Sequence, residues 1–183
     1  TDVAEALSAE HHRVVVFASR LSYDGKTSYV RRETIKGVEV HRVWSSRMGR
    51  DSTIGRAIDY LTFYLSISFS LLFVASKRDL IIAKTDPPML SIPLGFGARL
   101  KRSKLVNWLQ DIFPEVAQKL GYGSSNGAIM RVITQLRNRS LQRAGMNVVI
   151  GTRMAEIVHS HQVPRDRVHI IENFVDDTLI TPA

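Results

Sequence analysis

The sequence predicts an α/β fold, a doubly wound parallel sheet with helices on both faces. Short apolar runs, typical of strands that are covered on both faces, alternate along the chain with longer helical segments. Strands that alternate with helices in this way pair in parallel through right-handed crossovers. At 183 residues the chain has the length of one ordinary domain with a single core, so we expect one domain over residues 1–183.

The first part of the chain contains two predicted strands and one long predicted helix. Residues 1–10 have the pattern of the second half of a helix, and residues 13–19 form a continuous apolar run that predicts a buried strand. Residues 21–36 are polar and predict a loop. Residues 38–44 alternate apolar with polar side chains, which favours a strand nearer the sheet edge, and residues 53–76 predict a long helix.

The second part continues the alternation. Residues 79–84 predict another buried strand. Asp86 is suited to cap a helix and Pro87 to begin one, so a helix is expected from there to Arg99. The remaining predicted elements are strands at 104–111, 147–151 and 167–171, helices at 114–121, 128–144 and 152–160, and a flexible loop at 121–127.

The apolar segment at residues 60–75 raises the question of a membrane span. It is shorter than the about 18 to 20 apolar residues that a span needs, and serine and threonine residues interrupt it. We therefore expect a buried crossover helix here in preference to a span.

Composition and motifs exclude several classes of site. Cysteine is absent, so neither a disulfide framework nor a thiolate metal site is possible. The phosphate-binding Gly-x-x-x-x-Gly-Lys loop and the hydrolase Gly-x-Ser-x-Gly elbow are also absent. Gly95-Phe96-Gly97 lies within a helical pattern and predicts a close helix-packing site. His159 and His161 point in different directions on a helix, so we expect no metal site there.

Asp111 is the first candidate functional residue. It follows an apolar run and therefore lies at the carboxyl end of a predicted strand, which is where open α/β sheets bind their ligands. The alternative interpretation is an aspartate that caps the following helix. The net charge of +8 and the isoelectric point near 10.1 indicate an anionic binding partner, such as a phosphate-bearing substrate, an acidic membrane leaflet or a nucleic acid.

Four segments of the chain carry a family resemblance. They are residues 79–88, 106–115, 147–154 and 168–176, and the second has the sequence Val-Asn-Trp-Leu-Gln-Asp-Ile-Phe-Pro-Glu. In this order they resemble the amino-terminal half of the family-4 glycosyltransferases of the GT-B fold. The chain is most similar to the bacterial, fucosamine-transferase-like branch that builds capsule and O-antigen polysaccharides. The resemblance implies a Rossmann-like domain.

The resemblance also implies an activity. Such enzymes transfer a sugar, with retention, from a nucleotide-sugar donor to a lipid-linked or saccharide acceptor, and they need no metal or other cofactor. Their amino-terminal domain handles the acceptor, and their carboxyl-terminal domain binds the donor through a pair of glutamates at a fixed spacing. No pair of glutamates here has that spacing, so we expect the donor domain to be missing and this fragment to be inactive alone.

The family's opening strand and glycine-bearing loop would precede Thr1. Loss of that central strand exposes sheet edges, so we expect either upstream residues or a partner that supplies the strand, including a second copy of the chain.

The resemblance assigns roles to particular residues. Asp111 matches the polar position that faces the acceptor, where a catalytic carboxylate would orient the acceptor hydroxyl or help to deprotonate it, and we expect orientation. Asp86 and Thr152 follow strands and face the same cleft, with helix capping as the alternative for each. Glu115 follows a matched proline, with a first-turn carboxylate as the alternative, and Asn173 matches the asparagine before the interdomain linker.

Clustered basic residues give the excess positive charge a candidate role. They would attach the protein to the anionic leaflet at the inner face of the cell membrane. This attachment would bring the cleft to a lipid-phosphate acceptor. An ordinary solvated surface is the alternative. A basic Rossmann-like module that binds a nucleotide or nucleic acid is the rival class, although no helix-turn-helix or zinc-finger pattern is present. The candidate membrane-binding residues are Arg47, Arg50, Arg99, Lys101, Arg102 and Lys104.

Overall fold

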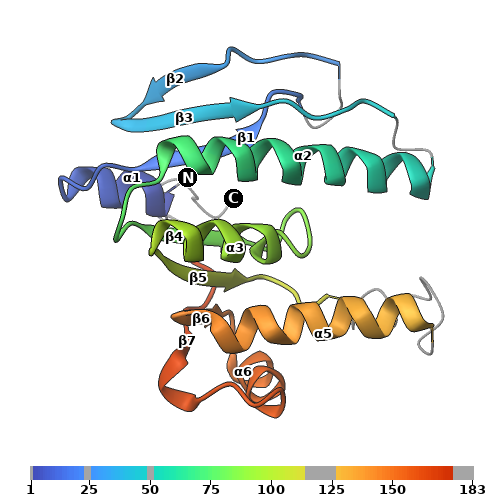
Figure 1. Ribbon diagram of the computed structural model, residues 1–183. Coiled ribbons are helices and arrows are strands. Elements are labelled where there is room, and N and C mark those ends of the chain that lie inside the picture. The colour runs from blue at the N-terminus through green and yellow to red at the C-terminus, as the bar shows by residue number, and fades with distance from the viewer. Residues whose placement is uncertain (1, 23–25, 49–51, 114–126, 175–183) are drawn as a thin grey trace, which may run out of the picture. The chain divides into compact units, whose positions relative to one another are not determined.

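The computed structural model describes residues 2–22, 26–48, 52–113 and 127–174 (Figure 1). The chain divides into two compact units, unit 1 over Thr1–Val74 and unit 2 over Ala75–Ala183. Each unit combines helices with a sheet, and the sheet of unit 2 is entirely parallel. The predicted α/β fold class is therefore confirmed.

Unit 1 contains a three-stranded sheet in the order β1-β3-β2. Strands β1 and β3 are parallel, and β2 is antiparallel to β3. Their bounds, with those of the two helices, are α1 Asp2–Ala9, β1 Val15–Ser19, β2 Arg32–Ile35, β3 Val38–Val43 and α2 Thr53–Val74.

Strand β2 corrects the predicted loop at residues 21–36. Lys36 and Gly37 both have positive φ, 47° and 81°, which is the conformation of a two-residue type I′ hairpin turn. The hairpin places β2 at the edge and β3 in the centre of the sheet, so the prediction that 38–44 lies nearer the edge was wrong. Three of the four β2 residues are polar and most of the strand is exposed, and it is held to β3 by backbone pairing and by the Arg42–Glu33 ion pair.

Helix α2 corrects the predicted buried crossover helix. Its large buried side chains, Phe63, Ile67 and Leu71, lie on one side. Large apolar side chains elsewhere on the helix, such as Leu65 and Phe73, are exposed. An apolar helix pattern does not distinguish burial on one side from burial all round, which explains the error.

Unit 2 contains a four-stranded parallel sheet in the order β4-β5-β6-β7. Helices α3, α5 and α6 flank it and form the connections between successive strands (Figure 1). The elements are β4 Leu80–Lys84, α3 Ser91–Lys101, β5 Lys104–Leu109, α5 Ala128–Arg143, β6 Met146–Val149, α6 Thr152–Ser160, the 3₁₀ turn η1 Arg165–Arg167 and β7 Val168–Ile170.

The core of unit 2 lies between its central strands and the helices. Strands β5 and β6 are buried along most of their length, whereas β4 is an edge strand in which Leu80 and Ile82 are exposed. The predicted buried strand at 79–84 is therefore buried on one face only. Gly95 lets α3 approach β5 closely, because a Cβ atom at this position would lie 3.3 Å from Leu105 Cδ2. The predicted helix-packing role of this glycine is confirmed.

A buried pair of asparagines joins the two central strands. Asn107 and Asn147 face each other in the β5–β6 register, and neither is exposed to solvent. Asn107 Nδ2 donates to Asn147 Oδ1 at 2.9 Å, and Asn147 Nδ2 donates to the Leu141 carbonyl at 3.0 Å. Because buried amides need partners, this pair favours one register of β5 against β6.

Replacing one member of the pair is expected to destabilise the fold. In Asn147→Leu the Asn107 amide and the Leu141 carbonyl lose their partner, which lowers the free energy of unfolding by about 2 to 4 kcal/mol. Chemical denaturation measures this loss. The double variant Asn107→Leu/Asn147→Leu should lose less than the sum of the two single variants, and strictly additive losses would contradict the coupling.

Candidate functional site

Polar side chains gather where the parallel strands of unit 2 end. Thr85 and Asp86 follow β4, Asp111 lies two residues after β5, and Thr152 lies three residues after β6. Because neighbouring parallel strands in one register end on the same side of the sheet, these residues share one edge. We call Thr85, Asp86, Asp111 and Thr152 the carboxyl edge.

Thr85 joins two of the strand ends, and the sequence predictions did not include it. The Gln110 backbone N–H donates to Thr85 Oγ1 at 3.1 Å, and hydrogen bonding by the Thr85 side chain favours the charged form of Asp111 and lowers its pKa. Thr85 thus fixes the turn after β5 and the side chain of Asp111. Its sequence signal is weak, a hydroxyl residue directly after a strand and before Asp86.

The surroundings of Asp111 change its acidity. Loss of hydration near neighbouring atoms raises the pKa of the Asp111 carboxyl above its ordinary value, although the side chain retains access to solvent. The Thr85 hydrogen bond opposes this by lowering the pKa, and the Asp86 charge raises it further. A reachable carboxylate with raised pKa is suited to accept a hydrogen bond from a hydroxyl group of a ligand.

Helix capping does not explain Asp86 or Thr152. Helix α3 begins at Ser91, not near Pro87 as predicted, and its N-cap is Leu90 without a side-chain hydrogen bond. The N-cap of α6 is Gly151, also without a side-chain hydrogen bond, so Thr152 is the first helical residue. Both side chains therefore stand at the carboxyl edge without the capping role that was the alternative for each.

The other predicted ligand-binding residues have different outcomes. Asn173 is exposed and lies three residues after β7, beyond the carboxyl end of that strand. Glu115, the predicted helix at 114–121, Arg50 and nearly all of the loop at 121–127 lie outside the described residues. Whether Asp111 caps the helix predicted at 114–121 is therefore untested.

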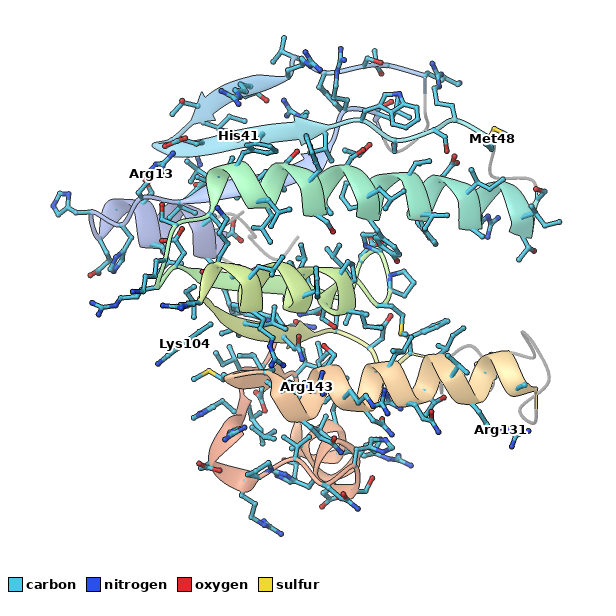
Figure 2. The ribbon with its side chains drawn as sticks, in the orientation of Figure 1. Arg13, His41, Met48, Lys104, Arg131 and Arg143 are labelled. Atoms are coloured by element: carbon cyan, nitrogen blue, oxygen red, sulfur yellow. The ribbon has the colours of Figure 1, made fainter. Side chains whose placement is uncertain are left out.

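Most of the predicted membrane-binding residues lie at the opposite edge of this sheet. They belong to the end of α3 and the start of β5, and the six residues of β5, at about 3.3 Å each, separate that edge from Asp111. Figure 2 shows Lys104 near the amino ends of the strands, with Arg143 toward the same end of α5 and Arg131 toward the other end. The residues concerned are Arg99, Lys101, Arg102 and Lys104.

Within the described parts of the chain, no group of three or more His, Cys, Asp or Glu side chains is placed to hold a metal ion. The His159 ring nitrogen Nδ1 lies 3.3 Å from the Val163 carbonyl oxygen, so this histidine is engaged in the turn after α6.

Two substitutions are expected to shift the pKa of Asp111 in opposite directions. Thr85→Val removes the hydrogen bond that favours the carboxylate, so the pKa of Asp111 rises. Asp86→Asn removes a neighbouring negative charge, so the pKa falls. Carboxyl ¹³C chemical shifts followed through a pH titration measure both effects, with Thr85→Ser as the control that keeps the hydroxyl. Equal behaviour of Thr85→Val and Thr85→Ser would refute the role given to this hydroxyl.

Comparison with protein families supports the resemblance seen in the sequence. A family model described as a glycosyl transferase 4-like domain matches residues 1–173, a range that includes the whole carboxyl edge and Asn173. No curated protein gives a significant match. The mixed α/β fold with its parallel four-stranded sheet agrees with a Rossmann-like amino-terminal domain of the GT-B fold. The chain therefore belongs to the glycosyl transferase 4-like family and is a glycosyltransferase domain.

Proposed function

We propose that the chain is the acceptor-binding, amino-terminal domain of a retaining glycosyltransferase. The enzyme would move a sugar, such as a hexose or aminosugar, from a nucleotide-sugar donor to a lipid-linked or saccharide acceptor in bacterial capsule or O-antigen synthesis. Both units would act as one domain. The observation that carries the proposal is a carboxylate with raised pKa, Asp111, at the carboxyl edge of a chain that belongs to this family.

The chemistry assigned to Asp111 is orientation of the acceptor. Its carboxylate accepts a hydrogen bond from the acceptor hydroxyl while Thr85 holds it in place. In a front-face transfer the acceptor oxygen bonds to the anomeric carbon as the bond from that carbon to the leaving phosphate breaks. The hydroxyl proton then passes to the leaving phosphate, so no strong base is required on this side of the cleft.

The remaining carboxyl-edge residues supply further contacts to the acceptor. Asp86 and Thr152 offer an accepting carboxylate and a hydroxyl on either side of Asp111 in the order of the strands. Asn173 and Glu115 complete the proposed substrate-binding set. A carboxyl-terminal domain would hold the donor, and we expect transfer to proceed without a metal ion.

We also propose that the enzyme works in the cytoplasm, peripherally attached to the inner face of the membrane. Each basic group near an anionic leaflet contributes about 1 kcal/mol of attraction. The basic cluster from Arg99 to Lys104 lies at the edge opposite Asp111, so attachment through it would turn the carboxyl edge away from the bilayer. Our proposal also includes attachment through unit 1, which carries Arg47. Among the described strands, β1 and β4 lie at the ends of their sheets, and the proposal includes pairing of a further strand there.

A transfer assay with the full-length protein tests the proposed function. With a panel of nucleotide sugars and polyprenyl-linked acceptors, Asp111→Asn should reduce turnover by about 100-fold or more, because the acceptor hydroxyl is no longer oriented by a charged group. Circular dichroism and thermal unfolding should remain unchanged.

Asp166→Asn is the matched control, since Asp166 is an exposed aspartate in η1, before the amino end of β7. Full activity of Asp111→Asn would remove Asp111 from the mechanism. Absence of transfer by the unaltered protein with every donor would favour the rival class, a nucleotide- or nucleic-acid-binding module.

A further inference from the structure

Helix α2 carries apolar side chains on two opposite sides. One side holds the buried residues Phe63, Ile67 and Leu71. Successive residues turn about 100° around a helix, which places a second apolar row on the other side. That row is 56% to 75% exposed, and we call it the outer ridge; its members are Ile54, Leu61, Leu65, Phe69 and Phe73.

Hydrogen bonds fix α2 along unit 1. The Ser46 backbone N–H donates to Thr62 Oγ1 at 2.9 Å, and the Met48 backbone N–H donates to Asp59 Oδ1 at 2.9 Å. The Ser46 hydroxyl also donates to Asp59. In Figure 2, Met48 lies on the segment that leads from β3 toward the start of α2.

These bonds decide how α2 can meet a bilayer. By length and composition α2 could cross a membrane. However, Asp59 and Thr62 lie within the helix and are bonded to backbone groups of the sheet-bearing unit. A helix held in this way lies along the surface of unit 1, and the side chains of its outer ridge are exposed.

The surroundings of the outer ridge favour an anionic lipid surface. Trp44 is 59% exposed and Met48 62% exposed on the segment between β3 and α2, and tryptophan is enriched at membrane interfaces. Arg47 and Arg56 lie near this end, and Lys77 and Arg78 follow the last residue of α2. No acidic residue belongs to the ridge, and the only carboxylate of α2, Asp59, is engaged by unit 1.

We propose that the outer ridge of α2 inserts into the boundary between headgroups and acyl chains of an anionic bilayer, with the helix parallel to the membrane plane. Apolar side chains flanked by tryptophan and basic residues bind membranes through buried apolar area together with attraction to anionic lipids. The named side chains of the ridge are all apolar, and the Thr62 hydroxyl, which lies between Phe69 and Phe73 around the helix, is bonded to Ser46. Such a surface suits a fluid acyl layer better than a polar protein surface. This proposal rests on the proposed function in one respect: a lipid-linked acceptor would give the enzyme a reason to bind a membrane.

Vesicle co-sedimentation of the full-length protein tests this proposal. Vesicles of phosphatidylcholine with phosphatidylglycerol should bind the protein more tightly than vesicles of phosphatidylcholine alone. Phe69→Glu should weaken binding by about tenfold or more, because a phenyl ring that would insert into the bilayer is replaced by a charge. Phe96→Glu is the matched control, since Phe96 of α3 is 68% exposed and Phe69 is 65% exposed. The control should bind like the unaltered protein.

A second readout reports where the protein contacts the lipid. Brominated acyl chains should quench the part of the tryptophan fluorescence that a Trp44→Phe variant lacks, which is the signal of Trp44. Three results would each overturn the proposal. They are absence of vesicle binding by the unaltered protein, equal loss of binding in Phe69→Glu and Phe96→Glu, and a dimer in solution that Phe69→Glu dissociates.

Vesicle binding requires no sugar donor, whereas transfer to a water-soluble acceptor analogue requires no bilayer. Sugar transfer without vesicle binding would therefore contradict only the role of the outer ridge. A protein that binds vesicles through the ridge but transfers no sugar would contradict only the proposed function.

Discussion

Parallel pairing of β4, β5 and β6 is the constraint on which the candidate site depends. The register that joins Leu80 to Lys104 and Val106 to Met146 makes these strands end on one side of the sheet. Thr85, Asp86, Asp111 and Thr152 are distant in sequence but follow those strand ends. Within the core, the Asn107–Asn147 hydrogen bond favours the same register, since a shift of β6 would leave buried amides without partners. Fold stability and site geometry therefore depend on one alignment.

The same alignment separates two kinds of charge. Asp86 and Asp111 follow the carboxyl ends of the strands, whereas Arg99, Lys101, Arg102 and Lys104 lie toward the amino end of β5. A net charge of +8 attracts an anionic partner but does not say where that partner binds. In the structure this basic cluster and the carboxyl edge lie at opposite edges of the four-stranded sheet. For this reason the proposed membrane contact moves to α2, where apolar and basic residues occur together.

The sequence was most informative for strands that are buried in the structure and therefore appear as apolar runs in the sequence. Apolar runs located every strand of unit 2 to within a few residues, and the run that ends near Asp111 identified the edge of the sheet that carries the candidate site. Strand β2 was missed because three of the four residues of Arg32–Ile35 are polar and the strand pairs with β3 through its backbone, so no apolar run marks it. The start of α3 was placed too early because Asp86 and Pro87 resemble a helix start but belong to the turn before it.

Other features depended on tertiary structure. Thr85 became a candidate only when the end of β4 was placed beside Gln110 and Asp111, which no local pattern specifies. The exposure of the outer ridge could not be predicted either, because a helix that is apolar on two sides has the same sequence pattern whether one or both sides are covered.

The central claim is that the acceptor binds at the carboxyl edge of the four-stranded sheet. The most direct measurement is hydrogen–deuterium exchange of the full-length protein with and without a polyprenyl-linked sugar acceptor. The account predicts slower exchange at residues 85–86, 110–113 and 151–153, with no change at 99–104. Slower exchange at 99–104 with an unchanged carboxyl edge would contradict it.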